Sequence, residues 1–339
     1  MSVDVGVAPV AERARTRRHS RTGAVAKVVG RRIFGLLLTL FLASFVIFGA
    51  LFLAPGSPLT FLTHGRSMTP EAVASLKAQY HLDEPFLTQY WRWLTAVLHG
   101  DFGSSIITHV SVSSLISTRL MNSVYLVLFA AVIIIALGLT VGILSGLRPG
   151  LLDNSLMFVA TAAMAVPTFV AAVVLTLIFA VNLGWFPVFG PGSGFSGRIE
   201  HLVLPATALA FASVAFVARL TRAAVRQELG AEHVQTATSR GLPYRTVVRR
   251  HVLRNAAVPV LTVTGLTIAG LIAGSVVVES VFQLNGLGSY LVAAVQQKDF
   301  PVVQAICLIY VFTFIVLNTV IDLTYSLLDP RISVGRSQA

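Results

Sequence analysis

Three polar side chains lie within hydrophobic stretches of this chain and could handle ions or protons in a membrane: Glu279, Asn318 and Asp322. An ionisable group in lipid is costly, so it usually faces a cavity or a partner. A structural role is also open for both carboxylates. Glu279 could sit in the membrane interface, and Asp322 is close enough to the membrane surface to pair with a basic group. We keep all three as candidate pathway or gating residues, although no chain of ionisable groups forms a proton relay.

The sequence offers no other catalytic constellation. Its eight histidines include no His-Glu-x-x-His, and there is no Gly-x-Ser-x-Gly. None of the three lysines follows the glycine of a phosphate-binding Gly-x-x-x-x-Gly-Lys-[Ser/Thr] loop. The single cysteine, Cys307, excludes an internal disulfide and a multi-cysteine metal site. We therefore expect no catalytic residue, metal site or cofactor in this chain, and its energy must come from a partner or a gradient.

Composition predicts the elements that carry these residues. Hydrophobic residues make up 55% of the chain and charged residues 12%, whereas about 25% charged is usual in soluble proteins. A helix needs roughly 20 apolar residues to cross the hydrocarbon core. Six segments qualify: 33–54, 122–147, 157–182, 202–220, 258–280 and 302–328. Pro167 should kink the third segment, and Pro205 falls in the first turn of the fourth. The sequence thus predicts an all-α integral membrane protein with six transmembrane helices.

The distribution of Lys and Arg predicts the orientation. Most of the 25 basic residues fall in the tail 1–32, in the loop 221–257 and in other segments on the same side. Since basic loops stay inside, both termini should be cytoplasmic. The basic tail is typical of contact with anionic lipid, so we expect no nucleic-acid partner. The apolar run 33–54 is too long for a signal peptide and should be an uncleaved first transmembrane helix.

The remaining boundaries follow from this topology. Residues 55–120 form an extracytoplasmic segment in which Thr69-Pro70-Glu71 predicts a helix start. The aromatic stretch 90–94 could anchor this segment in the membrane or dock an extracytoplasmic partner. Residues 121–328 should form a five-helix transmembrane core, and 329–339 a cytoplasmic tail. Two small-residue patterns, Gly138/Gly142/Gly146 and Gly270/Gly274, predict close helix packing.

The loop 221–257 reads as two short helices around a tight turn. The first should stop at Gly241, because glycine adopts the left-handed conformation at low cost. Pro243 suits the first turn of the second helix. That helix carries basic pairs at i,i+4 spacing and an apolar face of valines and one leucine: Arg245/Arg249, Arg250/Arg254, Val247, Val248, Val252 and Leu253. The loop should be a compact protrusion, although a basic loop lying on the lipid surface is the alternative.

This loop resembles the EAA loop of binding-protein-dependent ABC importer permeases, in particular the dipeptide/oligopeptide B type. The resemblance rests on Thr236-Ala237, Gly241 and residues 242–245 and 250–256. Further motifs extend it over residues 30–332, at 82–85, 100–105, 122–123, 276–282, 286–288, 299–304 and 328–331. Gln235 and Thr236 depart from the general Glu-Ala start, and Pro259 lies further from Gly241 than usual. The peptide-type branch shares these departures.

The resemblance implies a type I importer fold in the cytoplasmic membrane of a prokaryote. It implies a second, C-type permease subunit and two ABC ATPase subunits, alike or one of each of two kinds, which bind ATP and Mg²⁺. An extracytoplasmic binding protein would deliver the substrate. ATPase coupling would fall to Gln235, Thr236, Ala237, Gly241, Leu242, Pro243, Tyr244 and Arg245. A dipeptide or oligopeptide is the expected substrate, and a nickel chelate, haem or glutathione is the alternative within the family.

A secondary transporter is the competing class. It would use intramembrane carboxylates as its coupling site, and only Glu279 and Asp322 are available. It would also leave the protruding loop without a role.

Overall fold

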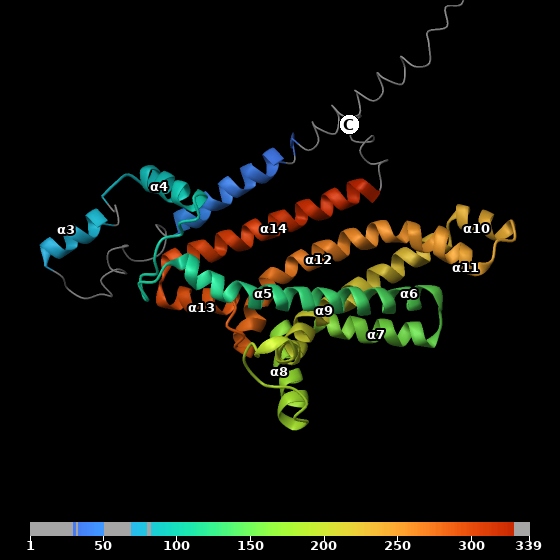
Figure 1. Ribbon diagram of the computed structural model, residues 1–339. Coiled ribbons are helices and arrows are strands. Elements are labelled where there is room, and N and C mark those ends of the chain that lie inside the picture. Colours follow the sequence, from blue (N-terminus) through green and yellow to red (C-terminus); the bar gives the residue numbers. More distant parts are fainter. Residues whose placement is uncertain (1–29, 32, 51–68, 80–82, 329–339) are drawn as a thin grey trace, which may run out of the picture.

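The computed structural model describes residues 30–31, 33–50, 69–79 and 83–328, and these residues are almost entirely helical (Figure 1). The tail 1–29 and residues 51–68 and 329–339 lie outside that description. Five long apolar helices and one bent helix pair could cross a membrane: Ile33–Ala50, Val112–Leu147, Gly194–Leu229, Tyr244–Phe282, Phe300–Ile321, and the pair Leu151–Ala165 with Thr168–Asn182. The all-α membrane fold predicted from hydropathy is confirmed.

Several helices are longer than their hydrophobic stretches. Val112–Leu147 consists of α5 (Val112–Ile133), η1 (Ile134–Gly138) and α6 (Leu139–Leu147), and α9 (Gly194–Leu229) has 36 residues. At 1.5 Å per residue α9 is about 54 Å long, well beyond the ~30 Å of hydrocarbon. The prediction that Pro205 lies in the first turn is therefore wrong, because it lies inside α9. Hydropathy detects the part of a helix that crosses the lipid, and it does not show where the helix ends beyond the lipid.

The third predicted segment is broken at Pro167. It consists of α7 (Leu151–Ala165), followed by α8 (Thr168–Leu175) and η2 (Thr176–Asn182), and the two halves are bent by 105°. Val166 adopts an extended conformation, with φ −85° and ψ 120°. The proline ring disfavours the helical conformation at the residue before it, and the extended Val166 is the point of the break. The predicted kink is confirmed, and it is sharp enough to make this segment a broken span or a re-entrant loop.

Helix α9 lies at the centre of the bundle and packs against α5, α6, α7, α8 and α12 (Leu253–Phe282) (Figure 1). The glycines Gly138, Gly142 and Gly146 allow the closest of these approaches. A Cβ added at Gly142 would lie 2.5 Å from Cβ of Thr221 on α9. A Cβ at Gly270 would meet nothing within 4 Å. Only the first glycine pattern therefore provides close packing along its whole length.

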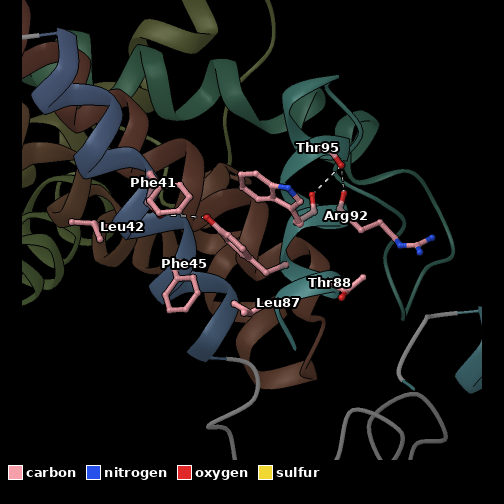
Figure 2. A pocket seen from close by; sticks show the side chains of 9 residues that line it. Phe41, Leu42, Phe45, Leu87, Thr88, Arg92 and Thr95 are labelled. Atoms are coloured by element: carbon pink, nitrogen blue, oxygen red, sulfur yellow. Dashed lines mark hydrogen bonds between the residues drawn. The ribbon is translucent and has the colours of Figure 1, made fainter. Parts of the chain in front are cut away.

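The first spanning helix packs against α4 (Phe86–Leu98) through aromatic side chains. Tyr90 is buried between them, and its hydroxyl lies 2.9 Å from Oγ of Ser44. Figure 2 shows Phe41 and Phe45 pointing from the first helix toward α4, along an apolar groove bounded by Arg92 and Thr95. The aromatic stretch 90–94 thus joins α4 to the first helix, although Trp91 stays exposed. Helix α3 (Pro70–Gln79) begins at the predicted proline.

A second core lies at the end of the bundle opposite α10, beneath α13 (Leu287–Gln297) and the start of α14 (Phe300–Leu328) (Figure 1). The buried Asp299 lies in the turn between these two helices. Its carboxylate accepts hydrogen bonds from the Ser105 hydroxyl and from the backbone N–H of Ile106. Asp299 therefore fastens the segment before α5 onto the α13–α14 turn.

Candidate functional site

The predicted protrusion is present at one end of the bundle (Figure 1). It consists of α10 (Glu232–Ser239) and α11 (Tyr244–Val247), and we call residues 232–247 the knob. Helix α11 runs on through η3 (Val248–Val252) into α12, and the whole stretch passes as one candidate span, Tyr244–Phe282. The second half of the knob is therefore the end of a membrane-spanning helix.

The turn of the knob has the geometry that the sequence predicts. Gly241 has φ +75°, and its N–H donates to the carbonyl of Thr238. The N–H of Leu242 donates to the carbonyl of Ala237. These two bonds form a Schellman motif, which satisfies the last carbonyls of α10. Pro243 then precedes α11 as its cap, with φ −56° and ψ 138°, one position earlier than predicted.

A small apolar core holds the knob against the bundle. Buried side chains of α10, α11, η3 and α12 meet Val225 of α9 in this cluster, which comprises Val225, Val234, Ala237, Val247, Val252 and Ala256. Ala237, one of the predicted coupling residues, is only 4% exposed. It therefore fixes α10 in place and offers almost no surface to a partner.

The other predicted coupling residues form the exposed tip of the knob. Gln235, Thr236, Gly241, Leu242, Pro243, Tyr244 and Arg245 are all exposed. Leu242 is 40% exposed and Tyr244 64%, although both carry large apolar surfaces. Neighbouring exposed apolar side chains on a rigid turn are typical of a protein contact site. Apart from Ala237, the predicted residues are thus exposed in α10, in the turn and in α11.

A buried carboxylate at the base of the knob was not predicted. Asp153 of α7 is 1% exposed and accepts a bidentate contact from Arg222 of α9, at 2.5 Å from Nε and 2.8 Å from Nη2. Nη2 of Arg226 lies 2.5 Å from the same carboxylate. His233 of α10 further lies 2.9 Å from Nδ2 of Asn255 on α12. In the sequence, Asp153 comes shortly after the turn that precedes α7. The prediction that this turn and the basic loop 221–257 lie on the same side of the membrane was the only signal that could have indicated the contact of Asp153 with Arg222 and Arg226.

The three candidate pathway residues lie in different surroundings. Glu279 is fully buried within the bundle near the end of α12, and its place in the membrane interface stays a prediction. Its Oε2 accepts hydrogen bonds from the N–H groups of Gly288 and Ser289 at the start of α13. Asn318 is partly buried in α14. Asp322 also lies in α14, but its side chain is outside the described part of the structure.

Comparison with known families decides the identity. Residues 138–334 match the family described as binding-protein-dependent transport system inner membrane component, and residues 25–129 match its N-terminal family. The first match alone covers more than half of the chain. The chain belongs to this family. It is a permease subunit of an ABC importer, and ATP hydrolysis belongs to a separate subunit.

Relatives cover almost the whole permease. It is 34% identical over 303 residues to the glutathione transport system permease protein GsiC of Escherichia coli K12, covering 89% of this chain and 97% of the relative. It is 33% identical to the probable peptide ABC transporter permease protein y4tP of Sinorhizobium fredii, with the same coverage.

Solved structures support the fold of the permease. An amino acid ABC transporter with histidines matches with a TM-score of 0.50 and 20% identity, over 63% of this chain and 94% of that chain. The MetNI methionine ABC transporter in an inward-facing conformation matches with a TM-score of 0.51 and 17% identity, over 63% and 96%. The permease therefore has the importer fold. Its membership of a binding-protein-dependent transport family implies, in general terms, a partner permease, ATPases and a binding protein.

Proposed function

We propose that the knob couples this permease to one of the ATPase subunits, and that the permease moves a peptide delivered by an extracytoplasmic binding protein. The observation that carries the proposal is the exposed tip Leu242–Tyr244 on a rigid turn whose second helix continues into α12. When the ATPases close on ATP, they pull on this tip and shift the permease between its two access states. Such a shift requires that nucleotide binds the two states with different affinity.

The orientation that this coupling needs agrees with the charge pattern. The knob and its flanking helix carry exposed arginines, and the ATPases act from the cytoplasm. We therefore place the knob and both termini on the cytoplasmic side, and residues 55–120 outside, as the distribution of basic residues predicts. The partner permease would be of the C type. ATP and Mg²⁺ bind only in the ATPase subunits.

Peptides are the proposed substrate class, because a relative over 89% of this chain is a probable peptide permease. Glutathione is the second candidate, because a relative of equal coverage is a glutathione permease. Uptake of labelled dipeptide, oligopeptide and glutathione by the reconstituted transporter, with its own binding protein, distinguishes the two. Competition of each compound with the others measures the preference.

The coupling proposal is tested by truncating the exposed tip. The double variant Leu242→Ala/Tyr244→Ala removes both apolar side chains and leaves the buried core of the knob intact. Loss of two anchors should lower substrate-stimulated ATP hydrolysis about tenfold or more, since a central contact residue contributes upwards of ~1 kcal/mol.

Leu151→Ala is the matched control, because Leu151 is an exposed apolar residue of α7 outside the knob. It should leave stimulated hydrolysis and recovery of the ATPases unchanged. Normal stimulation in the double variant would contradict the assignment of the knob.

A further inference from the structure

Glu279 lies at the end of α12 that is far from the knob, and it holds the start of the next helix. Its side chain is fully buried, and its Oε2 is 2.7 Å from the N–H of Gly288 and 3.2 Å from that of Ser289. The first N–H groups of a helix have no partner within the helix. The Glu279 carboxyl group accepts two of these N–H groups and also meets the positive end of the helix dipole.

The neighbouring residues are matched to this carboxylate. A Cβ on Gly286 would lie 2.3 Å from Oε2 of Glu279, and a Cβ on Gly288 would lie 2.5 Å from Cα of Val276. Both values are below any normal contact, so only glycine at these positions allows α13 to approach α12 so closely. The contact between the two helices is therefore built around this side chain.

Helix α5 also contacts this turn, close to Glu279: a Cβ on Gly286 would lie 2.7 Å from Oγ of Ser123. The Ser123 hydroxyl accepts a hydrogen bond from the N–H of Leu287 at 2.8 Å. Nδ2 of Asn122 donates to the carbonyls of Leu284 and Asn285, at 3.1 and 3.2 Å. The turn between α12 and α13 is thus held by side chains of α12 and of α5.

The knob and Glu279 lie at opposite ends of one continuous helical stretch. Tyr244–Phe282 has 39 residues, which corresponds to about 58 Å at 1.5 Å per residue. Under the proposed coupling role, movement of the tip at Tyr244 is passed along this stretch, through η3 and past Pro259, to its far end. Helix α13 follows such a movement only if it is attached to this stretch, and the Glu279 contact is that attachment.

Stability alone does not account for a carboxylate at this position. Burying an ionised group costs several kcal/mol, and replacing buried ionic groups by well-packed apolar residues is often neutral or stabilising. Two hydrogen bonds from a buried carboxyl group to the first N–H groups of α13 are instead directional, which suits a fixed attachment of α13 to α12.

We infer that Glu279 is a positioning residue that transmits movement of the knob through α12 to α13, and so to the end of the bundle opposite the knob. This inference rests on the proposed coupling role of the knob. It assigns Glu279 to the transmission of movement and not to contact with the substrate or with protons.

The test compares uptake with ATP hydrolysis in the complete reconstituted transporter. Glu279→Leu removes the acceptor, and Glu279→Gln keeps one amide oxygen near the N–H groups of α13. We expect Glu279→Leu to lower substrate uptake per ATP hydrolysed about tenfold, a typical size for coupling between sites. Glu279→Gln should retain part of the coupling. Both values are normalised to the amount of assembled transporter.

Asp299→Asn is the matched control. Asp299 is also buried at this end and accepts two hydrogen bonds, but it lies outside α12. Its substitution should leave uptake per ATP unchanged. The inference is overturned if Glu279→Leu leaves that ratio unchanged, if it lowers uptake and hydrolysis in parallel, or if Asp299→Asn lowers the ratio equally.

The tip variant Leu242→Ala/Tyr244→Ala separates the two proposals. If the tip variant abolishes stimulated hydrolysis while Glu279→Leu leaves uptake per ATP unchanged, the knob couples the permease to the ATPases but Glu279 does not transmit the movement. If the tip variant has no effect, the coupling proposal fails. The inference then fails with it, whatever Glu279→Leu does.

Discussion

The clearest test of the fold is substitution of alanine at Gly142, with Gly270 as its matched control. Both glycines belong to small-residue patterns that look alike in the sequence. Alanine at Gly142 would place a Cβ 2.5 Å from Cβ of Thr221 and 2.7 Å from the carbonyl oxygen of Ala218. Alanine at Gly270 would meet nothing within 4 Å. The same chemical change is therefore made once in a tight contact and once in open space.

The expected magnitude follows from these distances. Carbon atoms in contact prefer about 3.5 Å or more, so α6 and α9 must separate by roughly 1 Å to accept the new methyl group. Overpacking of this kind costs about 1–3 kcal/mol. Alanine returns roughly 0.8–1 kcal/mol of helix propensity at either position. Gly142→Ala should therefore destabilise the permease by up to about 2 kcal/mol, and Gly270→Ala should be neutral or stabilising.

The assay is the heat-induced loss of the monodisperse peak of the purified permease in mild detergent. A change of 1 kcal/mol shifts the midpoint by about 2–4 °C in proteins of 150–250 residues, and by less in a larger chain. The midpoint of Gly142→Ala should fall by a few degrees, while that of Gly270→Ala stays or rises. Equal midpoints for the two variants would refute the packing of α6 on α9.

Two further predictions concern charge and orientation. Asp153→Asn should lower the thermal midpoint of the permease by the equivalent of about 2 kcal/mol, because hydrogen bonds to charged groups contribute about 1.5–3 kcal/mol. Glu84→Gln is the control: it breaks an ion pair with Arg92, whose side chain is 53% exposed, and should cost under about 1 kcal/mol of stability. Equal losses of stability in the two variants would mean that the contact of Asp153 with Arg222 does not hold α7 against α9. In a Cys307→Ser background, a cysteine at residue 77 should react in intact cells with a membrane-impermeant thiol reagent, and one at residue 232 should not; the reverse pattern would invert the proposed topology.

Local features of the fold were predictable because the residues that cause them are neighbours in the sequence. The positive φ of Gly241 and the break at Pro167 follow from backbone sterics of one or two residues. The number of spanning segments follows from the thickness of the bilayer, which sets a length that hydropathy can detect. Hydropathy cannot show where a helix ends outside the lipid: α9 runs from Gly194 to Leu229, whereas the predicted segment was 202–220.

Residue roles that depend on the partner across the fold could not be predicted. Ala237 turns inward and Tyr244 outward, although both belong to one motif. Glu279 holds the start of α13, which no periodicity in α12 indicates. Asp153 meets Arg222 from a helix some 70 positions later.

For this permease, the sequence alone determined the apolar segments, the asymmetry of basic charge and the turn of the knob, because each depends on the composition or backbone of a short stretch. Tertiary structure alone decided which glycines are contacts, which carboxylates are buried and which face of the knob is free. Those outcomes depend on distances between helices, and only the packed bundle sets those distances.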